Sequence, residues 1–394
     1  IISFMIPRLI ANKLKQLTYQ YPVVAITGPR QSGKTTLVRN IFPQRPYLSL
    51  EDPDVRSFAL EDPRGFLSGN PEGIIIDEVQ RAPDLFSNIQ TRVDEIDKEG
   101  LYILTGSFNF SLMEGISQSL AGRVGLLNLL PFSFAELDQA NRLPDLLEDL
   151  LFTGSYPRIY DKRIPANEWY ANYVTTYLER DVRSIKNITD LDVFQRFLKM
   201  CAARSGQILN LSSLGDDCGI THNTAKSWLS VLQASFIVYL LRPHHKNFNK
   251  RLIKSSKLYF YDTGLLSYLI GIDSPENLST HAFRGPMFET WVISELLKGR
   301  LNRGLRENLF FWRDNSGHEI DCILEQGGRL LPLEIKSGQT ITRDYFKGLK
   351  YWSKISQTPG KEAYLVYGGS MDQKRGEGNV LGWRSFASQL PFKI

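Results

Sequence analysis

The first 138 residues alternate short apolar runs, rich in β-branched side chains, with longer amphipathic stretches. This alternation is typical of a parallel sheet whose strands are joined by crossover helices. The runs that we expect to be strands are Val23–Thr27, Tyr47–Leu50, Gly73–Asp77, Leu101–Thr105 and Val124–Leu130. The pattern therefore predicts an α/β domain over residues 1–138.

The pattern changes after residue 138. Residues 139–204 favour helix, because Trp169, Tyr173 and Tyr177 recur at helical spacing. Residues 205–265 predict two short helices and then a hairpin, which is the order of a winged helix. The expected segments are helices Leu211–Asp217 and Thr221–Gln233, strands Phe236–Leu241 and Lys257–Tyr261, and a wing at Arg242–Lys254.

Residues 266–394 predict one further α/β domain. Its expected elements are a helix from Phe288, strands Leu309–Arg313, Glu319–Leu324 and Leu330–Lys336, helix Tyr345–Ile355 and strand Ala363–Tyr367. At roughly 150 residues per domain, a chain of 394 residues has room for two or three domains. The pattern therefore predicts an α/β protein with a helical and winged-helix middle region.

Composition excludes several classes of protein. A hydrophobic share of 42% and a charged share of 23% exclude a disordered chain. The three cysteines show no C-x-x-C spacing, so we expect reduced thiols and a cytoplasmic protein. No apolar run approaches the roughly 18–20 residues that cross a bilayer, so no membrane partner is expected.

Positive charge gathers in the middle of the chain. Lys and Arg outnumber Asp and Glu by 47 − 42 = 5 overall. Between Cys218 and Tyr261 there are seven Lys or Arg residues and no Asp or Glu. Such a segment fits lysine and arginine contacts with DNA phosphates, or simply a solvated face. DNA is therefore a candidate partner.

Residues 28–35 read Gly-Pro-Arg-Gln-Ser-Gly-Lys-Thr and fit the phosphate-loop pattern G-x-x-x-x-G-K-[ST] in full, after a strand and before a helix. The glycines let backbone N–H groups face phosphates at a helix N-terminus. Lys34 should reach the β- and γ-phosphates of ATP, and Thr35 should ligate Mg²⁺. We assign nucleotide binding to Gly28, Pro29, Arg30, Gln31, Ser32, Gly33, Lys34, Thr35, Thr36 and Asp77.

The next two apolar strands end in polar residues that would complete a catalytic site. Asp77 should help to hold Mg²⁺, and Glu78 should orient or deprotonate the attacking water, although the pair could be a solvated strand end. Thr105 or Ser107 could sense the γ-phosphate. Arg123 suits an arginine finger offered to a neighbouring subunit, or it is a plain surface arginine. The finger role predicts nucleotide-dependent self-association.

These motifs together carry a family resemblance. Residues 21–136 resemble the core of an AAA+-type P-loop ATPase. The whole chain resembles a prokaryotic family of ATPases with a C-terminal domain of unknown function, DUF4143, on the stretches Tyr47–Pro53, Tyr177–Val182 and Tyr259–Gly264. Residues 154–158 resemble the G-x-P element of signalling and origin-binding ATPases, which would make Arg158 a second sensor.

The C-terminal element order resembles the core of the PD-(D/E)XK nuclease superfamily. Glu334 and Lys336 share a strand face, and Asp321 lies on the neighbouring strand. The resemblance implies that Asp321 and Glu334 bind a second Mg²⁺ or Mn²⁺, that Lys336 orients water, and that Glu289 is an accessory acid. Plain ion pairs would give the same pattern. Two functions therefore stay open: ATP-gated DNA cutting, or a nucleotide switch whose later domains only bind DNA or a partner protein.

Overall fold

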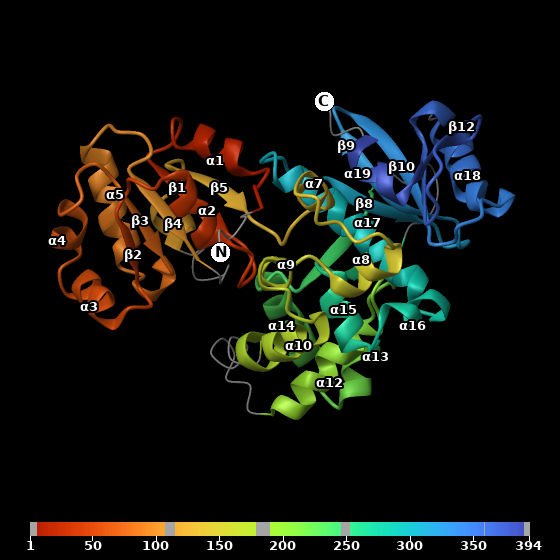
Figure 1. Ribbon diagram of the computed structural model, residues 1–394, viewed down its shortest axis with the longest axis horizontal. Coiled ribbons are helices and arrows are strands. Elements are labelled where there is room, and N and C mark those ends of the chain that lie inside the picture. Colours follow the sequence, from red (N-terminus) through yellow and green to blue (C-terminus); the bar gives the residue numbers. More distant parts are fainter. Residues whose placement is uncertain (1–5, 107–114, 179–189, 246–252, 358, 390–394) are drawn as a thin grey trace. The chain divides into compact units, whose positions relative to one another are not determined.

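The computed structural model describes residues 6–106, 115–178, 190–245, 253–357 and 359–389. The chain forms two compact units (Figure 1). The first unit comprises Ile1–Phe132 with the short segments Ala234–Phe236 and Arg300–Leu305. The second unit comprises Ser133–Gln233, Ile237–Gly299 and Arg306–Ile394.

The first unit is built on a five-stranded sheet in the order β2-β3-β4-β1-β5, with every pair parallel. Its strands are β1 (Val23–Thr27), β2 (Tyr47–Ser49), β3 (Ile74–Asp77), β4 (Tyr102–Thr105) and β5 (Val124–Asn128). The predicted strands and the parallel-sheet class are thereby confirmed. In this register Asp77 pairs with Thr105, so the carboxyl ends of β3 and β4 meet at one edge.

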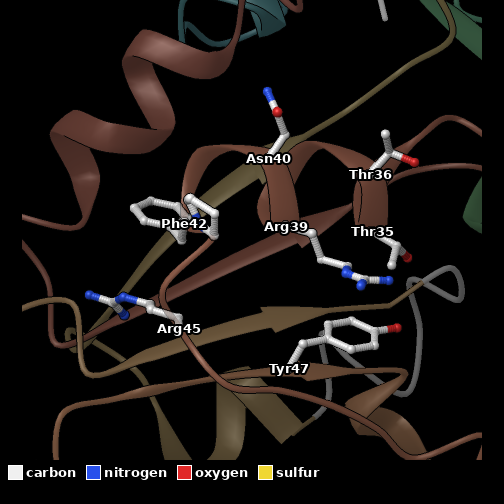
Figure 2. A pocket seen from close by; sticks show the side chains of 8 residues that line it. Thr35, Thr36, Arg39, Asn40, Phe42, Arg45 and Tyr47 are labelled. Carbon is white, nitrogen blue, oxygen red and sulfur yellow. The ribbon is translucent and has the colours of Figure 1, made fainter. Parts of the chain in front are cut away.

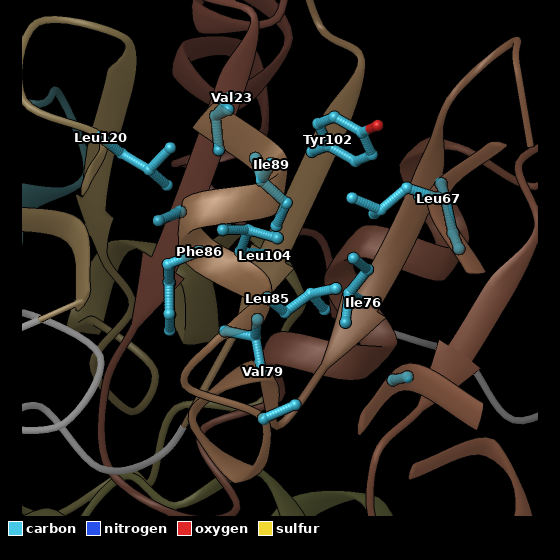
Figure 3. Close-up of a cluster of buried hydrophobic side chains, with 14 of the residues drawn as sticks. Val23, Leu67, Ile76, Val79, Leu85, Phe86, Ile89, Tyr102, Leu104 and Leu120 are labelled. Carbon is cyan, nitrogen blue, oxygen red and sulfur yellow. The ribbon is translucent and has the colours of Figure 1, made fainter. Parts of the chain in front are cut away.

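Helices cover both faces of this sheet. Successive residues of a strand point to opposite faces, so a central strand packs against helices on both sides. The helical segments are α1 (Ala11–Leu17), α2 (Lys34–Ile41), α3 (Pro53–Glu61), α4 (Pro63–Ser68), η1 (Val79–Arg81) and α5 (Leu85–Glu95). Ile76 and Leu104 pack with Phe86 of α5 in one core cluster (Figure 3). Ile75 and Ile103 pack with α1 and α2 in the other. The central strands β3 and β4 are therefore buried on both sides.

The second unit contains an eight-stranded sheet in the order β12-β13-β11-β10-β9-β8-β6-β7. Its strands are β6 (Val238–Pro243), β7 (Lys257–Phe260), β8 (Leu309–Arg313), β9 (Glu319–Gln326), β10 (Arg329–Lys336), β11 (Tyr364–Tyr367), β12 (Gln373–Arg375) and β13 (Gly378–Gly382). β6 and β7 form the antiparallel hairpin expected of the wing. However, β6 also pairs in parallel with β8, so the hairpin belongs to the C-terminal sheet.

Helices make up the rest of the second unit. They are α7 (Phe134–Gln139), α8 (Leu147–Thr153), α9 (Pro157–Lys162), α10 (Ala166–Tyr173), η2 (Val174–Leu178), α12 (Leu191–Ala202), α13 (Leu211–Cys218), α14 (His222–Ala234), α15 (Thr263–Leu269), α16 (Pro275–Thr280), α17 (Arg284–Leu301), η3 (Arg343–Phe346), α18 (Lys347–Ser356), η4 (Gly360–Glu362) and α19 (Trp383–Gln389). Asn210 caps α13, and Gly219, in the left-handed conformation, ends it. Among the residues that the structure describes, no helix is long and apolar enough to cross a membrane.

Candidate functional site

The loop between β1 and α2 needs both of its motif glycines. Gly28 has φ +149°, and a Cβ there would lie 2.1 Å from the Leu129 carbonyl oxygen. Gly33 has φ +93° and caps the N-terminus of α2. Side chains at these positions would be strained or would collide with the backbone. The motif spacing thus reflects a tight backbone turn at the start of a helix.

The polar side chains of this loop are suited to a bound anion. Lys34 is buried, and its Nζ donates to the carbonyl oxygens of Gly28 and Pro29 at 2.9 and 2.8 Å. The Ser32 hydroxyl is fully buried and has no hydrogen-bond partner within the described parts of the chain. A buried hydroxyl without a protein partner points to a ligand. An ammonium held at a helix N-terminus fits a phosphate group.

Asp77 is the centre of a hydrogen-bonded cluster at the carboxyl ends of the strands. Its Oδ2 accepts from the Thr35 hydroxyl at 2.8 Å and from the Tyr47 hydroxyl at 2.6 Å. Its Oδ1 accepts from the Thr105 hydroxyl and from the Glu78 N–H, the latter at 3.1 Å. Thr35 and Asp77, the two residues assigned to Mg²⁺, are therefore in direct contact. Hydroxyl and carboxylate oxygens are donors that Mg²⁺ accepts.

Tyr47 is a member of this cluster that sequence reasoning missed. It begins β2 and pairs with Ile75, so its ring lies on the same face of the sheet as Asp77. Burial raises the pKa of the Tyr47 phenol, and the adjacent Asp77 carboxylate raises that pKa further. The residue type gave no signal of this contact, which depends on strand register.

Glu78 adopts an unusual backbone conformation immediately after β3. Its φ and ψ are +55° and +41°, the left-handed region that a residue with a side chain seldom occupies. Its Oε2 accepts from the Gln80 side chain at 2.5 Å. Strained backbone of this kind clusters at functional sites, which supports Glu78 as a catalytic candidate.

The remaining predicted residues of the nucleotide site have different surroundings. Arg123 lies just before β5, and its Nε and Nη2 donate to the Asp94 carboxylate at 2.6 and 2.9 Å. A finger role in a neighbouring subunit would require Arg123 to leave Asp94. Arg158 is exposed on α9. Ser107 lies outside the described residues, so Thr105 is the sensor candidate whose contacts are known.

The candidate residues of the C-terminal sheet, Asp321, Glu334 and Lys336, lie together, and the lysine pairs with both carboxylates. Lys336 Nζ lies 2.9 Å from Asp321 Oδ2 and 2.8 Å from Glu334 Oε2. Asp321 also accepts from the Ile335 N–H at 2.8 Å. Burial raises the pKa of Glu334, and the neighbouring Asp321 raises it further. Burial is the largest influence on the pKa of Asp321 and would raise it, but Lys336, Lys257 and the Ile335 N–H together lower that pKa below its ordinary value.

A second lysine, Lys257 on β7, holds the accessory acid. Its buried Nζ lies 3.1 Å from Glu289 Oε1 and also contacts Glu319. The Tyr259 hydroxyl donates to Glu289 as well. The sequence places Lys257 in the basic segment between Cys218 and Tyr261, but its ammonium forms ion pairs with Glu289 and Glu319 and is not available to DNA. The contact depends on β7 joining the C-terminal sheet, which the local pattern did not reveal.

Comparison with known proteins agrees with the motifs. An AAA domain matches residues 20–138, a domain of unknown function (DUF8612) matches 144–276, and another (DUF4143) matches 284–386. Uncharacterized proteins of Mycobacterium tuberculosis (Rv2008c) and Mycobacterium bovis (Mb2031c) are each 32% identical to it over 336 residues, 84% of this chain and 74% of theirs. The chain belongs to the P-loop ATPase family that joins an AAA domain to a DUF4143 domain.

Solved structures similar to this AAA-domain protein are more distant. The Walker-type ATPase PABY2304 of Pyrococcus abyssi is 16% identical with a TM-score of 0.42, covering 66% of this chain and 94% of that one. AMPPCP-bound DnaA from Aquifex aeolicus is 14% identical with a TM-score of 0.30, covering 57% and 86%. At these TM-scores the likeness supports no statement about this chain.

The second metal ion expected in the DUF4143 domain is not supported. Among the described residues, no group of three or more His, Cys, Asp or Glu side chains is placed to hold a metal ion. The physical reason is visible between β9 and β10, where the Lys336 ammonium lies between Asp321 and Glu334. A lysine in this position already offsets the repulsion between the two carboxylates.

Residues 154–158 and 259–264, two of the stretches on which the family resemblance rests, meet at Asp262 in the AAA-domain protein. The buried Asp262 carboxylate accepts from the Ser155 N–H at 2.8 Å, the Ser155 hydroxyl at 2.9 Å, the Tyr170 hydroxyl at 2.6 Å and the Leu265 N–H at 2.9 Å. The bond from Leu265 caps α15. A buried carboxylate with four donors fixes the segments around it. Ser155 and Asp262 thus have a structural role within the second unit.

Proposed function

We propose that this protein is a Mg²⁺-dependent ATPase that works as a nucleotide switch. The observation that carries the proposal is the contact of Thr35 with Asp77 beside the buried Lys34 ammonium. Membership of the P-loop ATPase family supports it. Each of these side chains has the chemistry that its assigned task requires.

Each residue has a distinct task in this proposal. Lys34 exchanges its bonds to the loop carbonyls for bonds to the β- and γ-phosphates of ATP. Thr35 and Asp77 would hold Mg²⁺, which neutralises charge on the phosphates when bound. Glu78 orients the attacking water and accepts its proton. Thr105 keeps the Asp77 carboxylate in place by donating to it.

Calorimetry of ATP binding tests the nucleotide site. Lys34→Ala should weaken ATP binding by at least a hundredfold, because a charge-assisted contact to phosphate is lost in a buried site. Lys15→Ala is the matched control, since Lys15 is exposed on α1. Equal ATP affinity in the two variants would overturn the assignment.

For the DUF4143 domain we propose binding rather than cutting. Support comes from the lysine contacts of Asp321, Glu334 and Glu289, which leave each of these carboxylates ion-paired. Plasmid and single-stranded DNA, incubated with the protein and Mg²⁺ or Mn²⁺, with and without ATP, should stay intact. Cleavage that disappears in Lys336→Ala would show a nuclease instead.

DNA is the partner that we propose for the middle region. The order α13, α14, β6, β7 agrees with a winged helix, and Lys226, Arg242 and Lys254 are exposed. Replacing these three residues together by alanine should weaken duplex binding across all sequences and flatten its salt dependence, by about 0.9 per lost phosphate contact. Unchanged binding would mean that the basic segment is only a solvated face.

A further inference from the structure

A cavity of about 640 Å³ lies beside the nucleotide site in the first unit, between α2 and the start of β2. Its lining includes Thr35, Arg39, Phe42, Arg45 and Tyr47. Figure 2 shows Arg39 and Tyr47 extending to the same side as Thr35, whereas Arg45 extends to the other side. The lining includes two arginines and no acidic residue, so the cavity favours an anion.

One wall of the cavity is shared with the predicted metal site. Thr35 and Tyr47 both line the cavity, and both donate to Asp77 Oδ2. A carboxylate offers about four acceptor positions. On Asp77 these positions are taken by Thr35, Tyr47, Thr105 and the Glu78 N–H. A metal ion or its water can therefore reach Asp77 only when one donor leaves.

Tyr47 is the donor that can leave. Thr105 is fully buried on β4, the Glu78 N–H belongs to the neighbouring residue, and Thr35 is itself a metal ligand in the proposed site. The Tyr47 side chain is only half-buried and faces the cavity. Once the Tyr47 hydroxyl leaves Asp77, it can donate a hydrogen bond to an acceptor in the cavity.

Arg39 supplies the charge that would hold such an acceptor. Its guanidinium lies over the Tyr47 ring, 4.9 Å from the ring centroid. Arg39 is exposed, and no carboxylate pairs with it within the described ranges of the chain. Arg45 differs, because it donates to the Gly100 carbonyl oxygen and packs over Phe42. Arg39 and the Tyr47 hydroxyl can thus both contact an anion in the cavity.

We propose that this cavity binds inorganic phosphate. Arg39 pairs with the phosphate, and a phosphate oxygen accepts a hydrogen bond from the Tyr47 hydroxyl after that hydroxyl leaves Asp77. The proposal rests on the proposed ATPase function, because ATP hydrolysis supplies the phosphate beside Thr35. Phosphate binding frees an acceptor position on Asp77 and so strengthens Mg²⁺ binding. By linkage, Mg²⁺ strengthens phosphate binding by the same factor.

The test titrates inorganic phosphate into protein saturated with ADP and Mg²⁺, so that the α- and β-phosphate positions at the loop of residues 28–35 are already filled. Calorimetry should show phosphate binding that weakens at least tenfold in Arg39→Gln. Arg64→Gln on α4, an exposed arginine outside the cavity lining, should bind phosphate as the unaltered protein does. Equal ADP affinity in both variants shows that the site is folded. No phosphate binding, or equal binding in both variants, would overturn the proposal.

Tyr47→Phe tests the coupling. In the unaltered protein, phosphate should tighten Mg²⁺ binding to the ADP complex, whereas in Tyr47→Phe the Mg²⁺ affinity should no longer respond to phosphate. An undiminished response in Tyr47→Phe would contradict the role of the hydroxyl. The two proposals fail separately: normal ATP hydrolysis without phosphate binding removes the cavity site alone. Arg39-dependent phosphate binding without ATP hydrolysis removes the ATPase function alone.

Discussion

Gly154→Ala should destabilise the second unit severely. Gly154 has φ +67° and ψ −152°, a region that essentially only glycine occupies. A Cβ at this position would lie 2.3 Å from the Tyr170 hydroxyl oxygen and 2.5 Å from Asp262 Oδ1. The new methyl group would therefore strain the backbone and also force Tyr170 away from Asp262, to which it donates.

The cost of this substitution can be estimated from its separate causes. Backbone strain costs about 1–3 kcal/mol, and an overpacked methyl group about 1–3 kcal/mol. Loss of the hydrogen bond from Tyr170 to the Asp262 carboxylate costs about 1.5–3 kcal/mol. A total of about 4 kcal/mol or more corresponds to a fall in melting temperature of roughly 8–16 °C for a unit of this size.

Two other glycines separate strain from steric collision. Gly271 has φ +77° but open space around it, so Gly271→Ala should cost only about 1–2 kcal/mol. Gly264 lies in α15, and a Cβ there would lie 2.4 Å from the Tyr170 hydroxyl oxygen, so Gly264→Ala should cost about 1–3 kcal/mol. Thermal melts should rank Gly154→Ala lowest. If the melting temperature of Gly154→Ala lay within about 3 °C of that of Gly271→Ala, this reasoning would be refuted.

Two further predictions concern the charged residues. Arg123→Ala should abolish self-association with a non-hydrolysable ATP analogue in sedimentation experiments, whereas Asp94→Asn, which frees the guanidinium, should promote it; a monomer in every nucleotide state would contradict both expectations. Lys336→Met should destabilise the protein by about 3 kcal/mol in denaturant titrations, because Asp321 and Glu334 lose their shared cation. Calorimetry should detect no Mn²⁺ binding that is lost in Asp321→Ala. Such binding would contradict the ion-pair interpretation and support a metal site at Asp321 and Glu334.

The sequence was sufficient where function depends on adjacent residues. The loop at residues 28–35 and the pair Asp77-Glu78 are continuous in the chain, and the strands that hold them are apolar on both faces. The order of these strands and motifs along the chain therefore predicts both the parallel sheet and the residues at the carboxyl ends of its strands.

Contacts between distant segments could not be predicted in this way. The Tyr47–Asp77 bond depends on the register of β2 against β3, and Arg123 meets Asp94 across 29 positions of sequence. Lys257 reaches Glu289 only because its hairpin joins the C-terminal sheet through β6 and β8. Local patterns specify elements and faces, whereas register and sheet order decide which charges meet.

The most direct test of the central claim is ATP turnover by Glu78→Gln, measured beside ATP binding in the same preparation. An amide keeps the shape of the Glu78 side chain but cannot accept a proton from water, so ATP affinity should persist while turnover falls by about 10²–10⁴-fold. Hydrolysis at the unaltered rate in Glu78→Gln would contradict the account.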